Sequence, residues 1–199
     1  MKKLLFAAAF AVLGFTANAQ EEQTFGFAKG DVFMTGSVGF GSESTGDLKT
    51  NVFTIAPKAA YFVSDNIAVG LGLGFTSGKE EDGFAEEKVD VFGVDAFGRY
   101  YFTPANQFSL FAELGLGYDS VNNETTVGDV TTDSDSAQFG ANLGAGLNYF
   151  VSSKFSIEAG IAVLGYSTND NGGNGAESTD SFSVGGDWTN VTFGVNYKF

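Results

Sequence analysis

The chain ends in the stretch GVNYKF, residues 194–199, where apolar and polar residues alternate up to a terminal phenylalanine. The alternation extends back to residue 190. The apolar residues occupy every second position: Val191, Phe193, Val195, Tyr197 and Phe199. A period of two sustained over residues 190–199 predicts a β-strand with one apolar and one polar face. The pattern in the rest of the chain decides what kind of sheet this strand joins.

The same alternation recurs in earlier segments of the chain. These segments are residues 32–42, 52–62, 67–76, 89–102, 108–118, 138–150 and 155–166. In 67–76, for example, Leu71 and Leu73 lie on one parity, and glycines lie between them on the other. Each segment is close to the ~9–11 residues that a tilted strand needs to cross a bilayer. With the terminal strand they predict an all-β fold of eight strands.

The connections between these segments alternate in length. Short turns are expected at 63–66, 103–107 and 151–154, and long polar loops at 43–51, 77–88, 119–136 and 167–187. Short periplasmic turns and long extracellular loops are typical of outer-membrane barrels. We therefore expect an eight-stranded antiparallel up-and-down transmembrane β-barrel. Its last three long loops, rich in small polar residues, are expected to be mobile.

Charged residues within the strands separate the inner face from the outer one. Six of them share the parity rich in glycine and polar residues: Lys58, Asp95, Arg99, Glu113, Glu158 and Lys198. A Lys or Arg that faces lipid at mid-bilayer costs about 2–4 kcal/mol, so a membrane barrel turns such residues inward. A soluble lipocalin-like barrel has the reverse pattern. We expect these three cations and three anions to form an ionic network in the lumen.

Two further features concern the barrel wall. Aromatic residues flank the short turns, as in Tyr61-Phe62 and Tyr100-Tyr101-Phe102, and they predict an aromatic girdle at the periplasmic rim. Pro57 lacks the N–H that a strand in a closed barrel donates, so a local bulge is expected there.

The N-terminus carries an export signal. Two lysines precede the apolar run LLFAAAFAVLGFTA, and the small residues of ANA, 17–19, follow it. A short transmembrane anchor is the alternative, but the run is shorter than the ~20 residues that a spanning helix needs. We expect residues 1–19 to be a signal peptide, 20–30 a periplasmic lead-in and 31–199 the barrel. The expected location is the outer membrane of a Gram-negative cell envelope.

Over the whole mature chain, these patterns resemble the small eight-stranded outer-membrane β-barrel family, which includes OmpA/OmpX-type and OmpW-like barrels. In that family a terminal phenylalanine with apolar residues at alternate positions before it is the signal for the barrel-assembly machinery. The residues that match this signal are Val191, Phe193, Val195, Tyr197 and Phe199. The resemblance implies that the assembly machinery and outer-membrane lipid are partners of the chain, which is expected to be a monomer.

Composition excludes several functions. The chain has no histidine and no cysteine, which rules out Ser-His and thiol catalysis and Cys/His zinc sites. We expect neither enzymatic activity nor a cofactor. A net charge of −14 argues against nucleic acid as a partner. The loops carry carboxylates that could bind divalent cations weakly through oxygen ligands: Glu80, Glu81, Asp82, Asp133 and Asp135.

Two functions remain open. The first is a structural or surface-interaction role, with the lumen plugged by its ionic network. The second is a narrow, porin-like pore for small or hydrophobic solutes, as suggested for OmpW-like barrels. The interior of eight strands is just wide enough for side chains to fill, which favours the first function. The glycines on the inner parity leave some room in the lumen, so the pore function stays open.

Overall fold

The computed structural model describes residues 25–173, 175–185 and 192–199. The expected signal peptide, 1–19, and Val191 of the assembly signal lie outside the described residues. The described strands are β1 Val32–Thr45, β2 Leu48–Phe62, β3 Ile67–Glu81, β4 Ala85–Tyr101, β5 Phe108–Val127, β6 Val130–Phe150, β7 Phe155–Asn169, β8 Thr179–Val184 and β9 Thr192–Lys198. Within this part of the chain, no helix is long and apolar enough to cross a membrane.

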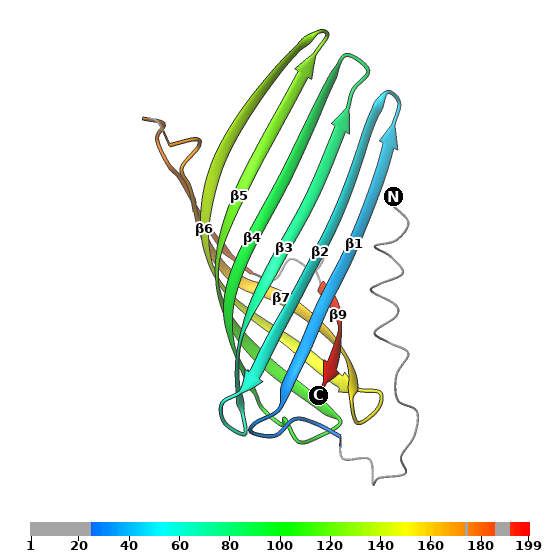
Figure 1. The fold of residues 1–199 in the computed structure, drawn as a ribbon, viewed down its shortest axis with the longest axis vertical. Helices are drawn as coiled ribbons and strands as arrows, with labels where there is room; N and C mark the ends of the chain where they lie inside the picture. The colour runs from blue at the N-terminus through cyan, green and yellow to red at the C-terminus, as the bar shows by residue number, and fades with distance from the viewer. Residues whose placement is uncertain (1–24, 174, 186–191) are drawn as a thin grey trace.

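The strands form one antiparallel sheet that closes on itself. From β1 to β7 each strand pairs with the next one along the chain, and β9 pairs with both β7 and β1. The short segments β8 and β9 pair with successive parts of β7, so together they form the eighth strand. The predicted eight-stranded up-and-down barrel is therefore confirmed. Figure 1 shows the C-terminus beside β1, at the end of the barrel where the short turns lie.

β7 is irregular near its middle. It pairs with β9 up to Gly160–Thr192 and with β8 from Leu164–Val184 onward. At the same height the register between β6 and β7 shifts, and Val163 has no partner on β6. The bulge expected at Pro57 does not form: β1 and β2 pair through that residue without a shift, and the β2–β3 ladder lacks paired positions at residues 56 and 57 but keeps the same register on both sides of them.

The long connections are shorter than the sequence suggested, because the strands run on beyond the expected membrane span. In segment 119–136, β5 and β6 pair up to Val127 and Val130 and are joined by a tight turn. Gly128 adopts φ +60° in that turn, a conformation that favours glycine. Segment 167–187 likewise contains β8. Thr and Val, which are good strand formers, continue the alternation into segments whose polarity predicted loops.

The periplasmic end of the interior is a small aromatic core. Its buried apolar residues are Phe27, Phe33, Ala60, Phe62, Ala68, Phe97, Tyr101, Phe111 and Phe150. The expected aromatic girdle takes only one ring from each adjacent aromatic pair, such as Tyr61-Phe62 and Tyr100-Tyr101. Tyr61 and Tyr100 are 47% exposed on the outside, whereas their neighbours Phe62 and Tyr101 are 0% exposed. Successive residues of a strand point to opposite faces, so each aromatic pair supplies one ring to the rim and one to the core.

Candidate functional site

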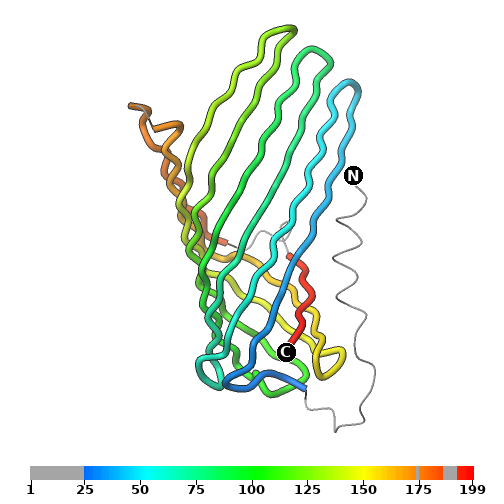
Figure 2. The backbone as a smooth tube through the Cα atoms, viewed as in Figure 1, coloured from blue at the N-terminus to red at the C-terminus, as the bar shows by residue number. Residues whose placement is uncertain are grey.

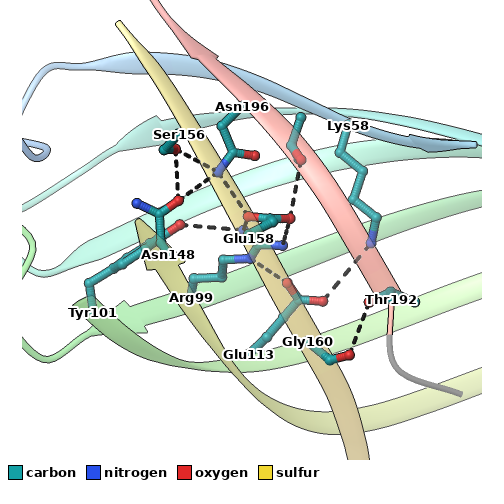
Figure 3. Close-up of polar contacts among 11 residues, drawn as sticks. Lys58, Arg99, Tyr101, Glu113, Asn148, Ser156, Glu158, Gly160, Thr192 and Asn196 are labelled. Carbon is teal, nitrogen blue, oxygen red and sulfur yellow. Dashed lines mark hydrogen bonds and ion pairs between the residues drawn. The ribbon is translucent and has the colours of Figure 1, made fainter. Parts of the chain in front are cut away.

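Arg99 lies at the centre of the charged lumen. It stands on β4 in register with Glu113 of β5, and its Nε is ion-paired with that carboxylate. Its Nη1 lies 2.7 Å from Glu158 Oε2, and its Nη2 donates to Glu158 Oε1 at 3.2 Å. Glu158 belongs to β7, which is not a neighbour of β4 in the sheet. The guanidinium therefore joins two walls of the barrel across its interior (Figure 3).

Lys58 extends this network to β2. Its Nζ lies 3.2 Å from Asp95 Oδ2 and 3.9 Å from Glu113 Oε1. The structure thus brings together five of the six lumen charges named from the sequence: Lys58, Asp95, Arg99, Glu113 and Glu158. The ion pairs run continuously from β2 through β4 and β5 to β7.

Lys198 was expected in the same network but lies apart from it. Its Nζ donates to the backbone carbonyl of Gly26 at 2.6 Å and lies 3.7 Å from Asp31 Oδ2. Lys198 is too far from the network because it is the last residue of β9, at the periplasmic mouth and below the level of Arg99 along the barrel axis. The cluster of five consequently holds two cations and three carboxylates rather than a neutral set.

Aromatic rings enclose the guanidinium. The Arg99 Cζ lies 5.2 Å from the centroid of the Phe97 ring and 4.4 Å from that of Phe111, distances at which cation–π attraction operates. Glycines on neighbouring strands make room for these rings. A Cβ at Gly70 would overlap Phe97, and one at Gly146 would overlap Phe111. Because these inward glycines have no side chain, rings from the next strands occupy the space beside them.

Neutral polar side chains complete the shell of Glu158. Thr35 donates its hydroxyl to this carboxylate at 3.1 Å, and Asn196 donates its amide at 3.0 Å. Asn196 also donates to Asn148 Oδ1 at 2.8 Å. The Tyr101 hydroxyl accepts from Arg99 Nη1 at 3.3 Å. Sequence reasoning did not name these residues as part of a site, although the inward parity of the two asparagines, each beside a rim tyrosine, was a usable signal.

Open space remains beside and above the network. One cavity of about 480 Å³ is bordered by Lys58, Arg99 and Glu158. A second of about 410 Å³ is bordered by Asp119 and Asn142 among others. Among the described residues, no group of three or more His, Cys, Asp or Glu side chains is arranged to hold a metal ion. The cavities are lined by charged and small polar groups.

The acidic residues expected to bind divalent cations lie in the upper hairpins, where several already have partners. Glu81 Oε1 lies 2.6 Å from Lys79 Nζ, and Glu80 accepts a hydrogen bond from Thr50 at 3.4 Å. Asp82 caps the β3–β4 turn, accepting the backbone N–H of Ala85 at 2.7 Å. This bond and a second one from the N–H of residue 84 hold the pKa of Asp82 below its usual value. Asp133 and Asp135 lie on β6.

The described part of the terminal signal forms an outward stripe on β9. Phe193 is 72% exposed, Val195 53% and Phe199 64%. The Tyr197 ring lies 4.9 Å from that of Phe199 and 5.0 Å from that of Phe155. The stripe therefore lies on the face that lipid would contact, ending at the periplasmic rim.

Comparisons with known proteins agree with this architecture. A sequence model of the family described as outer membrane protein beta-barrel domain matches residues 6–199. A major outer membrane protein from Thermus thermophilus aligns with a TM-score of 0.53 at 13% identity, covering 85% of this chain and 98% of its own.

Two other structures align less well. The attachment invasion locus protein Ail of Yersinia pestis gives a TM-score of 0.49 at 17% identity, covering 86% of this chain and 99% of its own. The N-terminal β-barrel domain of Pseudomonas aeruginosa OprF gives a TM-score of 0.45 at 18% identity, covering 87% of this chain and 100% of its own. A comparison with curated proteins found no match.

Proposed function

The chain belongs to the outer membrane protein β-barrel domain family, and from this premise we propose that it has a structural or surface-interaction role with a lumen closed to solute flow. It resides in the outer membrane as a β-barrel. Under this proposal the upper hairpins are the part presented to the outside. The barrel supplies a rigid support for them, and no solute passes through it.

The observation that carries the proposal is the bridge from Arg99 to Glu158 across the barrel interior. An ion pair between non-neighbouring strands lies in the path that a solute would take. The rings of Phe97 and Phe111 occupy the space on either side of the guanidinium. Each of the two cations pairs with two carboxylates, so each charge stabilises the position of the next.

A narrow pore for small or hydrophobic solutes is the second candidate. It is supported by the two cavities of about 480 and 410 Å³ in the lumen. Conduction through them would require the Arg99 bridge to open, because this ion pair crosses the interior from β4 to β7.

Ion current across a planar bilayer separates the two candidates. We expect the purified barrel to insert and to show little or no steady current, because no continuous water path crosses the network. Insertion is verified independently by heat-dependent mobility of the folded barrel on a gel. Large, stable channels in the unaltered protein would contradict the closed lumen and establish the pore.

The remaining proposals concern partners. We propose a monomer that is assembled through its C-terminal stripe, has no catalytic activity and does not bind nucleic acid. Weak binding of divalent cations at the acidic hairpins is a further proposal. The absence of calcium heat in calorimetry at millimolar concentration would exclude it, and a dimeric mass in detergent would exclude the monomer.

A further inference from the structure

A segment ahead of the first strand crosses the periplasmic mouth of the barrel. Figure 2 shows residues 25–31, in blue, passing across the lower end before the chain rises into β1. Phe27 in this segment is 2% exposed although it belongs to no strand. Its ring centroid lies 4.8–5.4 Å from four rings, those of Phe33, Phe62, Tyr101 and Phe150. These rings come from β1, β2, β4 and β6, so Phe27 occupies the middle of the mouth.

Backbone hydrogen bonds hold the segment at two places on the rim of the mouth. The N–H of Phe27 donates to the carbonyl of Pro104, in the β4–β5 turn, at 2.7 Å. The N–H of Gly30 donates to the carbonyl of Phe62 at 2.9 Å, and the N–H of Phe62 donates back to the carbonyl of Asp31 at 2.9 Å. The segment is therefore attached to the first and the second short-turn regions, and Phe27 itself makes the attachment to the second.

Lys198 adds an attachment to the last strand. Its Nζ reaches the Gly26 carbonyl at 2.6 Å and Asp31 at 3.7 Å, and it lies 5.5 Å from the centroid of the Phe150 ring. The cation that the sequence assigned to the lumen network thus joins the segment to β9.

Glycine is required where the segment passes the second turn. Gly26 adopts φ +91°, and a Cβ there would overlap the backbone of Pro104 and Ala105. An L-residue with a side chain would therefore be strained and would also push the segment away from the turn.

We infer that residues 25–31 are a stopper that seals the periplasmic mouth, with Phe27 as its inserted side chain. It forms a second barrier in series with the Arg99 network and goes beyond the proposed function, which assigns closure to the network alone. The ring of Phe27 closes the space between four strands by apolar packing, whereas the network closes the lumen by charge. Removal of either barrier leaves the other in place.

Thiol labelling tests whether Phe27 is inserted. The chain has no cysteine, so single-cysteine variants report one position each. The Phe27→Cys variant and the Lys29→Cys control, whose native residue is exposed, are compared in the folded barrel with a water-soluble reagent. We expect labelling at position 27 to be at least about tenfold slower, because it requires local opening of the stopper. Equal rates in folded protein would overturn the inference.

Bilayer current tests whether the stopper is a barrier. We expect Arg99→Ala combined with Gly26→Ala to conduct several-fold more than Arg99→Ala alone, because only the double variant lacks both barriers. The control adds Gly41→Ala instead, at a position with free space around it. If Gly26→Ala adds nothing to Arg99→Ala, the stopper is not a barrier. Steady current in the unaltered protein would contradict the closed lumen instead, so the two failures are distinguishable.

Discussion

Arg99 is 5% exposed and contacts carboxylates from β5 and β7. A buried cation of this kind is stable only while its partners remain charged and close. Removing it leaves Glu113 and Glu158, which both paired with it, close together inside the barrel. The two carboxylates would then repel each other, with Lys58 as the nearest remaining cation of the cluster.

We therefore expect Arg99→Ala to lower the free energy of unfolding by about 3–5 kcal/mol, as measured by urea unfolding in detergent. Lys79→Ala is the matched control, since Lys79 also pairs with two carboxylates but is 41% exposed on an upper hairpin. Its loss should change stability little, because water screens exposed pairs. An Arg99→Ala barrel as stable as the parent would contradict the structural role of the network.

Asp82 provides a pH-dependent contact outside the membrane span. Backbone N–H groups of Ala85 and Phe84 hold its pKa below the usual aspartate value. The stabilisation is therefore complete above the pKa of an unfolded aspartate and is lost as the pH falls through the lower, folded-state pKa. We expect NMR titration of its carboxyl to show this lowered pKa, and Asp82→Asn to remove the transition. Titration at or above the ordinary value would contradict the turn geometry.

At the scale of the element, alternation along each strand sets which residues meet lipid. Leu143 of β6 is 41% exposed on the outer face, and Asn142 next to it borders a lumen cavity. We expect a cysteine at Leu143, and likewise at Leu71 and Leu114, to react with a lipid-phase label. A cysteine at Asn142 or Glu113 should not react. The opposite pattern would contradict the membrane orientation of the faces.

The terminal strand makes a structural contact and carries the proposed assembly signal. Phe199 donates its N–H to the carbonyl of Val32 at 3.0 Å, while its ring is outside the barrel. We expect deletion of Phe199 to abolish insertion in cells but to leave refolding into detergent largely intact. One backbone bond and one exposed ring contribute little to stability, whereas under our proposal the assembly machinery reads the terminus. Normal insertion of the deletion variant would show that the terminus is no more than a strand end.

At the scale of the whole molecule, the described strand pairings differ in length around the barrel. Strands β4 and β5 pair over seventeen positions, whereas the described residues of β9 and β1 pair over four. We call this described β9–β1 pairing the seam. Segments with few cooperative hydrogen bonds open at lower free energy than long ladders do.

We therefore expect amide hydrogens of β9 to exchange faster than those in the middle of β4 when exchange is followed by mass spectrometry in detergent. The Phe27→Ala variant should increase exchange in β9 further, because the stopper joins that strand through Lys198. Phe108→Ala, which removes an outward ring at the same rim, is the control. Protection of β9 as strong as that of β4 would show that the seam is not the weak point.

Much of this architecture was predictable because it depends on local properties of the chain. The period of two identifies each strand and its faces, and the short turns set the register of adjacent strands. This is why the sequence alone places Arg99 on the same inner face as Glu113, in neighbouring strands. The outer-membrane location likewise follows from the inward charges and the outward apolar residues.

Other features were decided only when the sheet closed. Phe27 packs against Phe150, Lys198 donates to the carbonyl of Gly26, and Glu158 pairs with Arg99. In each case the partner lies far away in the sequence. The register shift between β6 and β7, which leaves Val163 without a partner on β6, likewise appears only in the paired strands. Alternation determined by itself that this chain would form an eight-stranded barrel with a charged interior. What fills that interior, and at which height, was decided by the tertiary structure, because closure is what brings non-neighbouring strands within reach of one another.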